Sequence, residues 1–308
     1  HTAVSVTLTD ARRLDPPPAF FTHGFQLEPE PALLPPPPAA DDDDAIKAVV
    51  YPATEALVRR VTGASRVVAF HHLRRTAGGA PGHQPATAAH VDYSPHNAAA
   101  LHGTMATPAD RRGRFVIVNV WLNVGLAPIA DHHLAMCDAR SVVAPDDFLR
   151  RVHIDARSGR PSETMQLAPG HAAHHTWSYY PAMTRDEALL FLQYDSDHTS
   201  ATRYTFHSAV VDPRAPAGHP PRDSLEVRLI GFFPGWEPDT VPAVLSEDAV
   251  AACVSRIMGS VLHPRHWPAP AATWLSGKVH GGDGPEAALR IMVANGAAKG
   301  HHGLDALT

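Results

Sequence analysis

The sequence predicts a mainly β fold with flanking helices, of the sandwich or jelly-roll type. Several segments after residue 65 are β-branched or alternate apolar with polar residues, and Gly, Pro or Asp bound them. The connections between these segments are long and polar, which is typical of sandwiches and jelly rolls. Helical spacing of apolar residues returns only after Pro234.

The first 45 residues are predicted to form a proline-rich arm. Runs of proline at 16–18 and 35–38 remove amide donors, so residues 15–44 are expected to be irregular rather than to form a core element. Acidic residues at 41–44 precede an apolar stretch and suit a helix N-terminus. Pro52 is expected to split this stretch and to leave a helix over 53–62.

The segments after residue 65 assemble the predicted core, residues 46–235. The predicted strands are Arg66–Leu73, Arg114–Leu122, Leu134–Val143, 204–211 and 225–233. Beyond them, a C-terminal extension over 236–308 is expected to pack on the same domain. Its predicted helices span 246–258 and 285–294, where apolar residues recur at helical spacing.

The composition fits one domain and excludes several classes of protein. A chain of 308 residues with 44% apolar content can bury a substantial core. A net charge of −5 without a basic stripe argues against nucleic acid, and no stretch is apolar enough to cross a membrane. Two cysteines indicate a reducing compartment, and we expect a cytoplasmic protein without an export signal. The oligomeric state stays open.

The most informative motif is His90-Val91-Asp92, which His207 follows 115 positions after Asp92. Two imidazoles and one carboxylate are the set that holds Fe(II) on one face and leaves other positions open. Residues i and i+2 of a strand point to the same side, so His90 and Asp92 can bind one ion together. His207 lies in an aromatic and β-branched segment, and we predict that it is the third ligand.

Other histidines offer alternatives among the 22 in the chain. His198 could replace His207, but it lies in a polar loop setting. The adjacent pairs are predicted not to chelate, because neighbouring residues on a strand face opposite sides. They are His71-His72, His132-His133 and His174-His175.

Two arginines follow His207 and could place a guanidinium beside the metal. Arg222 and Arg228 open and continue a second apolar strand, and a guanidinium can grip a carboxylate with two parallel hydrogen bonds. This combination suggests a 2-oxo acid cosubstrate. Both arginines fall on the same face of the predicted strand, so the alternation of side chains does not show which of them binds the cosubstrate. Arg228 is favoured because an arginine within an apolar strand needs an anion. Asn119 and Trp121 share a strand face and could touch cosubstrate or substrate, although Trp121 could equally be a core residue.

In these motifs the chain resembles the CmcJ/NvfI branch of the Fe(II)/2-oxoglutarate dioxygenases, which includes the cephalosporin 7-alpha methoxylation protein and gibberellin desaturase-like proteins. The resemblance covers about residues 66–233 and implies a double-stranded β-helix with metal ligands at one mouth. It implies Fe(II), 2-oxoglutarate and O2, and hydroxylation, desaturation or cyclisation at a C–H bond of a small molecule in secondary metabolism. Some relatives use an Arg-x-Ser pattern like that at Arg222 for the distal carboxylate. The matching segments are 90–94, 118–121, 134–142, 177–187, 193–196, 206–209 and 222–228.

Two departures from this family keep other functions open. Leu122 and Leu192 stand where relatives tend to carry a cation, on strands that we expect near the pocket. They motivate a first alternative, a non-heme iron oxidase of the same fold that needs no 2-oxoglutarate. The many histidines motivate a second, a non-catalytic His-rich metal-binding protein.

Overall fold

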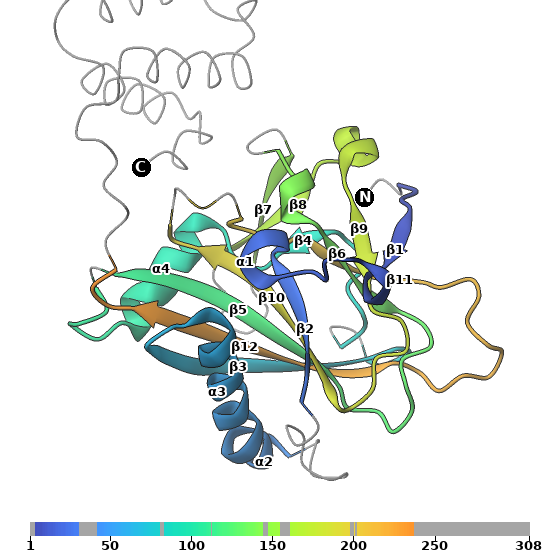
Figure 1. The fold of residues 1–308 in the computed structure, drawn as a ribbon, viewed down its shortest axis with the longest axis horizontal. Coiled ribbons are helices and arrows are strands. Elements are labelled where there is room, and N and C mark those ends of the chain that lie inside the picture. Colours follow the sequence, from blue (N-terminus) through green and yellow to red (C-terminus); the bar gives the residue numbers. More distant parts are fainter. Residues whose placement is uncertain are drawn as a thin grey trace, which may run out of the picture. The chain divides into compact units, whose positions relative to one another are not determined.

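The computed structural model describes residues 4–30, 42–80, 83–111, 113–143, 147–154, 161–197, 200 and 202–236, all within one compact unit. Most of them are strands (Figure 1). The strands are β1 (Leu8–Asp10), β2 (Phe25–Pro29), β3 (Arg66–Thr76), β4 (His90–Val91), β5 (Arg114–Asn123), β6 (His133–Cys137), β7 (Phe148–Ile154), β8 (Pro161–Leu167), β9 (Trp177–Tyr179), β10 (Glu187–Asp195), β11 (His207–Val210) and β12 (Asp223–Phe233). The α-helices are α1 (Phe20–His23), α2 (Asp43–Ala45), α3 (Tyr51–Thr62) and α4 (Pro95–Met105). Short helical turns span Ala11–Arg13, Ile46–Val50, Ala139–Ser141 and Pro169–His174.

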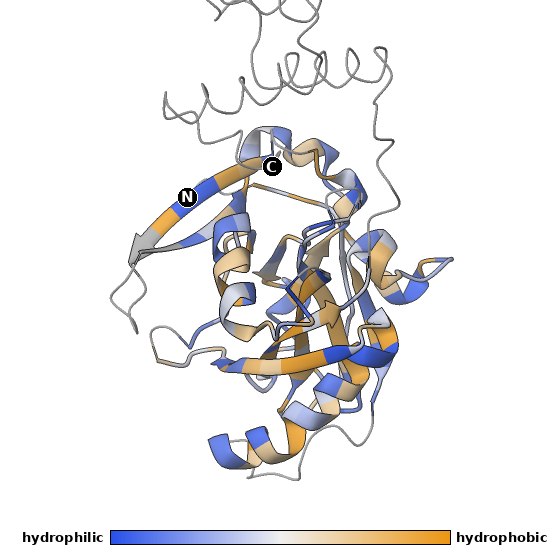
Figure 2. Cartoon of the chain, turned by 90° about the vertical axis from the view of Figure 1, so that its left-hand side faces the viewer, coloured by the Kyte–Doolittle hydropathy of each residue, from blue (hydrophilic) through white to orange (hydrophobic). Residues whose placement is uncertain are grey.

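The strands form two sheets, which confirms the predicted jelly-roll fold. One sheet has seven strands in the order β1-β9-β6-β11-β4-β8-β7, and the other has five in the order β2-β10-β5-β12-β3. Every pairing is antiparallel except β1 with β9. In both orders, strands that are distant in sequence lie side by side, as in a double-stranded β-helix. Figure 2 shows the apolar residues concentrated along the inner strands.

The five-stranded sheet presents two different faces. Alternate residues of β5 (Val116, Val118, Val120 and Leu122) are buried in a cluster with Leu57 and Val58 of α3. The residues between them face the seven-stranded sheet: Phe115, Ile117 and Trp121 pack in clusters that also hold residues of β6 and β9. This period of two places Asn119 on the inner face beside Trp121.

Strand β12 repeats this pattern with polar residues on its inner face. Its apolar residues Leu225, Val227 and Leu229 join the α3 cluster. Glu226 pairs with Trp121 and Arg228 with Asn119 across the ladder, so both point between the sheets. The inner face of β12 therefore carries ionisable groups within the jelly roll.

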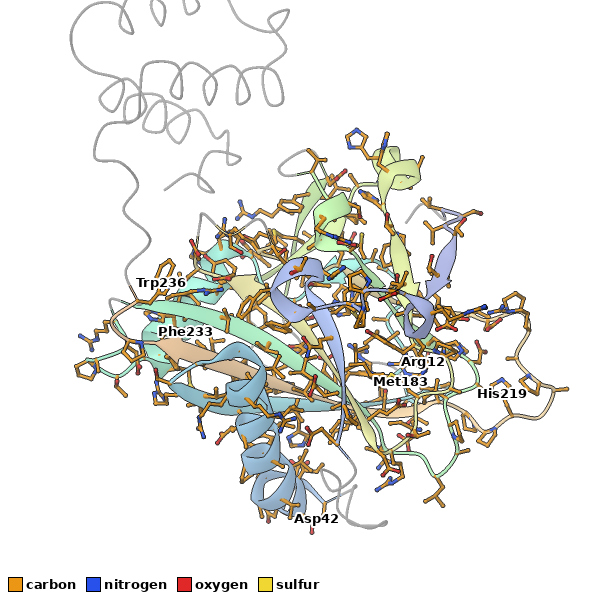
Figure 3. The ribbon with its side chains drawn as sticks, viewed as in Figure 1. Arg12, Asp42, Met183, His219, Phe233 and Trp236 are labelled. Carbon is orange, nitrogen blue, oxygen red and sulfur yellow. The ribbon has the colours of Figure 1, made fainter. Side chains whose placement is uncertain are left out.

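The helix before β3 begins earlier than predicted. Asp42 accepts hydrogen bonds from the amides of Asp44 and Ala45 at the start of α2 (Figure 3), as the acidic run suggested. A π-helical turn then leads directly into α3, and Pro52 lies in the first turn of α3 without ending the helix. The helix ends at Gly63, which adopts a positive φ of 74°.

Other expectations need correction. The whole stretch 15–44 is predicted to be irregular and outside the core, but Phe25–Pro29 pairs with β10 and Phe25 is buried, because Phe25 and Leu27 supply an apolar face. The predicted strand 134–143 ends at Cys137, where Asp138 caps a 3-10 turn. The predicted strand 204–211 begins only at His207.

The C-terminal helices predicted at 246–258 and 285–294 lie outside the described residues, and the division at residues 45 and 235 stays a prediction. Among the described helices, none is long and apolar enough to cross a membrane.

Leu122 and Leu192 do not line the pocket, contrary to expectation. Both are buried in the cluster under α3, on the face of the sheet opposite Asn119 and Trp121. A cation at either position would enter an apolar core instead of reaching a ligand between the sheets. The two departures therefore do not remove a pocket cation.

We predict that Leu192→Lys destabilises the fold without improving cosubstrate binding. An unpaired ammonium in this cluster should lower the free energy of unfolding by roughly 3 kcal/mol or more. Denaturant titration measures the change. Leu126→Lys is the control, because Leu126 is 82% exposed and its replacement should be nearly neutral. Unchanged stability together with tighter 2-oxo acid binding in Leu192→Lys would contradict this assignment.

Candidate metal centre

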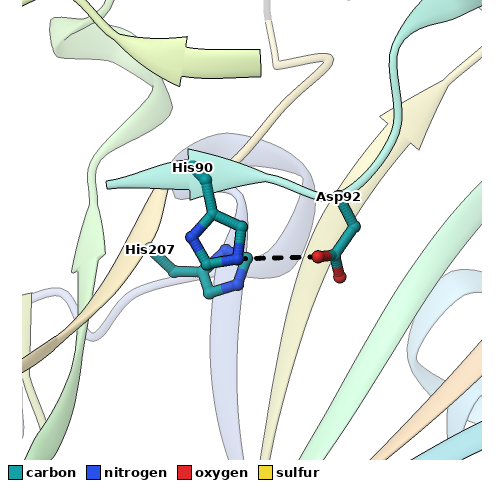
Figure 4. A group of neighbouring side chains, drawn as sticks. All are labelled: His90, Asp92 and His207. Atoms are coloured by element: carbon teal, nitrogen blue, oxygen red, sulfur yellow. Dashed lines mark ion pairs between the residues drawn. The ribbon is translucent and has the colours of Figure 1, made fainter. Parts of the chain in front are cut away.

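The three predicted ligands meet in one place. His90 lies in β4, Asp92 directly follows it, and His207 begins β11 (Figure 4). One ligand atom from each residue lies within 4.8 Å of the others, and His90 Nε2 is 3.5 Å from Asp92 Oδ1. In the described part of the chain, this is the single group of three or more such residues close enough to share an ion.

The strand pairing creates this meeting point. His207 and His90 are directly opposite each other on β11 and β4, so their side chains leave the sheet on the same side. Their ring centroids are 4.4 Å apart, and Phe191 packs 4.7 Å from the His207 ring. The Asp92 amide donates to Gln193 Oε1 of β10 at 2.8 Å, which fixes Asp92 against the other sheet.

Backbone carbonyls orient both imidazoles. His90 Nδ1 lies 2.7 Å from Ala88 O, and His207 Nδ1 lies 3.4 Å from Thr205 O. A protonated Nδ1 donating to these carbonyls leaves Nε2 of each ring with a lone pair for a metal ion. Burial and the nearby positive charge of His90 lower the pKa of His207 to about 3, so His207 is neutral, as a ligand must be.

Asp92 is held through one of its two oxygens. Its Oδ2 accepts from Asn119 Nδ2 at 2.9 Å and lies 3.1 Å from Arg228 Nη2, whereas Oδ1 faces His90. Burial by itself would raise the pKa of Asp92, but Arg228 and His90 outweigh it and hold that pKa well below its usual range. For His90, burial opposes the charged form, yet Asp92 raises the pKa of the ring overall.

This donor set fits Fe(II). Two imidazole nitrogens and one carboxylate oxygen lie within 4.8 Å of one another, and two histidines with one carboxylate are the ligand set of non-heme iron oxygenases. A narrow pocket adjoins the three ligands. Its lining residues are Arg75, Ala86, His90, Asp92, Leu134, His207, Arg222, Glu226 and Arg228.

The two predicted arginines have different surroundings. Arg228 has anionic partners within the protein, Asp92 at 3.1 Å and Glu226 at 3.0 Å. Arg222 is 3% exposed and has no ion pair with any residue that the structure describes. Its burial and the nearby charge of Arg75 lower the pKa of Arg222 to about 10, although the charge of Glu226 acts in the opposite direction.

Arg222 is nevertheless held firmly in position. Its Nε donates to Ser224 Oγ at 3.1 Å and its guanidinium carbon lies 4.9 Å from the centre of the Trp121 ring. Trp121 is thus both a core residue and a support for this cation.

A tight turn before β6 supplies a third contact to Arg222. Arg222 Nη1 donates to the carbonyl of His132 at 2.7 Å, and His132 has a positive φ of 53°, which is unusual for a residue with a side chain. Asp131 stabilises this turn by accepting from the amides of His132 (2.6 Å) and Asp212 (2.7 Å). His219, whose Nε2 is 3.8 Å from Asp131, lies in the loop between β11 and β12 (Figure 3).

The remaining histidine expectations are less informative. His198, the alternative to His207, lies outside the described residues. His72 contacts Tyr51 and Asp43, His132 pairs with Asp131, and His175 lies 3.1 Å from the buried carboxylate of Asp147. These contacts are hydrogen bonds and ion pairs within the protein.

The sequence did not reveal three residues of this site. Gln193 contacts the Asp92 amide, Glu226 pairs with Arg228, and Arg75 lines the pocket. The inner face of β12 gave a usable signal for Glu226, because it shares parity with Arg222 and Arg228. Gln193 lies in one of the family-like segments, but nothing in the sequence indicated its contact.

Comparison with known proteins agrees with this geometry. A family model described as "Oxidoreductase/YMDC permease-like domain" matches residues 1–232. The Fe(II)/2-oxoglutarate-dependent dioxygenase nvfI of Aspergillus novofumigatus is 34% identical over 194 residues, which cover 61% of this chain and 68% of the relative. The hydroxylase/desaturase CTB9 of Cercospora beticola is 32% identical over 206 residues, covering 59% of this chain and 61% of the relative. The chain thus spans about two thirds of the length of these relatives.

A solved structure shares the fold over most of the described chain. The iron and alpha-ketoglutarate-dependent endoperoxidase NvfI superposes with a TM-score of 0.67 at 28% identity, covering 74% of this chain and 83% of that protein. The jelly roll, the site geometry and the extent of these matches lead to one conclusion. The chain belongs to the oxidoreductase family of the matching model and is a member of the NvfI-type Fe(II)/2-oxoglutarate-dependent dioxygenases.

Proposed function

We propose that this protein is an Fe(II)/2-oxoglutarate-dependent dioxygenase that oxidises a C–H bond of a small molecule. The convergence of His90, Asp92 and His207 beside a buried, unpaired arginine is the observation that carries the proposal. Bound Fe(II), with 2-oxoglutarate and O2, would supply the oxidising power. The protein positions the reactants and keeps water from them.

The three proposed Fe(II) ligands are held in position by different groups of the protein. Nε2 of each histidine is available because Nδ1 faces a backbone carbonyl. Asn119 and Arg228 hold Oδ2 of Asp92, which leaves Oδ1 as the ligand atom. A carboxylate bound through one oxygen occupies one position on the metal, so the remaining positions stay open for cosubstrate and O2.

Arg222 is our candidate for binding the distal carboxylate of 2-oxoglutarate. A buried guanidinium without a counter-ion is costly, and a carboxylate is the group that its planar fork fits best. Arg228 was favoured from the sequence because it needs an anion, but Asp92 and Glu226 supply that anion. The ring of Trp121 packs against the Arg222 guanidinium, and Asn119 donates a hydrogen bond to Asp92.

The reaction outcome and the substrate belong to the proposal. Relatives are named as hydroxylase/desaturases and as a dioxygenase, all from fungi. We therefore expect hydroxylation, desaturation or cyclisation of a secondary metabolite, with no nucleic-acid or membrane partner. A cytoplasmic location stays a prediction. The oxidase without 2-oxoglutarate loses its motivation, because Leu122 and Leu192 face away from the pocket.

The first prediction concerns the metal and the cosubstrate. Anaerobic addition of 2-oxoglutarate to the Fe(II)-loaded protein should give a saturable visible charge-transfer band at one iron per chain. His90→Ala, Asp92→Ala and His207→Ala should each abolish stable iron binding, because two ligands remain. His174→Ala is the control, since His174 is exposed outside the site. Tight iron binding without the band would favour the oxidase that needs no oxo acid, and loose binding of several ions would favour a non-catalytic protein.

The second prediction concerns Arg222. Arg222→Met should raise the dissociation constant of 2-oxoglutarate about 100-fold, as expected for loss of one partner of a buried charge pair. The affinity for Fe(II) should stay unchanged, because Arg222 does not contact the ligands. The same anaerobic titration measures both constants. If Arg228 were the main contact instead, Arg222→Met would bind 2-oxoglutarate normally.

The third prediction concerns Asn119. Asn119→Ala removes a hydrogen bond to Asp92 Oδ2 and should weaken metal binding about tenfold, as loss of a supporting contact to a metal ligand does. Calorimetric titration with Mn(II) in the absence of O2 measures this. Asn123→Ala is a matched control on the same strand: Asn123 bonds the carbonyls of Ala127 and Met183, so its loss should lower stability but not metal affinity. Equal metal affinity in both variants would refute the role of Asn119.

A further inference from the structure

The pocket beside the metal ligands holds more positive charge than its acidic residues offset. Arg228 is neutralised by Asp92 and Glu226. Arg222 and Arg75 also line this pocket, and neither forms an ion pair within the described ranges. The two charges are close enough that Arg75 lowers the pKa of Arg222. Two like charges placed together repel each other, and an anion bound between them would relieve this repulsion.

Strand register places these two guanidinium groups on the same face. Arg75 of β3 lies directly opposite Ser224 of β12, and Arg222 precedes Ser224 by two residues. The Ser224 hydroxyl connects them, because it accepts from Arg222 Nε at 3.1 Å and donates to the carbonyl of Arg75 at 3.2 Å. The backbone amide of Ala77 donates to Arg222 O at 2.8 Å, so the two strands are fixed at this point.

Arg75 is anchored with part of its hydrogen-bonding capacity left over. Its Nη1 donates to the carbonyl of Gln84 at 2.7 Å, which sets the guanidinium at the rim of the pocket. A guanidinium has five N–H donors, so this bond leaves donors for a ligand. Arg222 likewise uses Nε and Nη1 within the protein.

The size of the pocket limits what these donors can bind. The cavity between the lining side chains has a volume of about 10 Å³, roughly the space of one water molecule. It therefore has no room for two anions side by side. The anion that reaches Arg222 therefore lies within reach of Arg75.

We propose, on the basis of the function proposed above, that Arg75 is a second cosubstrate-binding arginine. Arg75 and Arg222 form a two-guanidinium clamp on the distal carboxylate of 2-oxoglutarate, each binding one carboxylate oxygen. The clamp selects a dicarboxylic oxo acid over a monocarboxylic one. Arg75 contributes less than Arg222, because it lies at the partly exposed rim, where solvent weakens charge interactions.

Anaerobic titration of the Fe(II)-loaded full chain with two oxo acids tests the clamp. The acids are 2-oxoglutarate and 2-oxopentanoate, which has the same carbon chain without the distal carboxylate. Arg75→Met should weaken 2-oxoglutarate binding about tenfold and leave the affinities for 2-oxopentanoate and Fe(II) unchanged. In a double-mutant cycle with Arg222→Met, the two losses should be less than multiplicative, because both residues bind one group.

Two controls separate this inference from its neighbours. Arg59→Met removes an exposed cation from α3, across the same sheet, and should alter none of these affinities. If Arg75→Met misfolds and loses iron binding, Arg75→Lys replaces it as the test variant. The clamp then predicts that Arg75→Lys weakens binding of 2-oxoglutarate but not of 2-oxopentanoate. Unchanged 2-oxoglutarate binding, or equal losses for both acids, would overturn the clamp. Absence of any band in the wild-type protein would instead overturn the proposed function.

Discussion

The arrangement of the site depends on one carboxylate, Asp92, that two strands of the opposite sheet hold. Asp92 follows β4 of the seven-stranded sheet, whereas Asn119 and Arg228 reach its Oδ2 from β5 and β12 of the five-stranded sheet. Gln193 of β10 adds a bond to its backbone amide. The two sheets are therefore joined by polar contacts at the point where the metal ligands meet. Glu226 extends this network, because its carboxylate lies 3.0 Å from Arg228 and offsets part of the buried positive charge.

The inner face of β12 explains how the fold tolerates so much charge. Alternation gives this strand an apolar side toward α3 and a polar side between the sheets. Near Asp92, ion pairs neutralise Arg228 on the polar side of the strand. Farther along the chain, Arg222 forms no ion pair with a described residue, and its hydrogen bonds to Ser224 and His132 hold it in place. The charge that remains after folding is the place where we propose that an anionic ligand binds, because ion pairs within the protein neutralise Arg228.

Local patterns were enough to predict much of this structure. The grouping of His90, Asp92 and His207 and the shared face of Asn119 and Trp121 followed from spacing and alternation. So did five of the strands, β3, β5, β6, β11 and β12, although not all of their ends. Partnerships between strands did not follow, since they depend on register: parity alone could not tell that Arg228 meets Asp92 while Arg222 stays unpaired. The same limit explains the error on Leu122 and Leu192, whose strands lie near the pocket while their side chains face α3. Proline content misled the reading of Phe25–Pro29, because an edge strand tolerates a terminal proline.

The position of β2 has a consequence for any shortened version of this chain. β2 is the outermost strand of its sheet and covers β10, whose backbone groups it pairs from Phe191 to Glu187. A chain that began after residue 30 would leave β10 as an open, strongly apolar edge, which is the kind of surface that recruits strands from other molecules. Removal of the N-terminal segment would therefore threaten solubility before it affected the group of His90, Asp92 and His207.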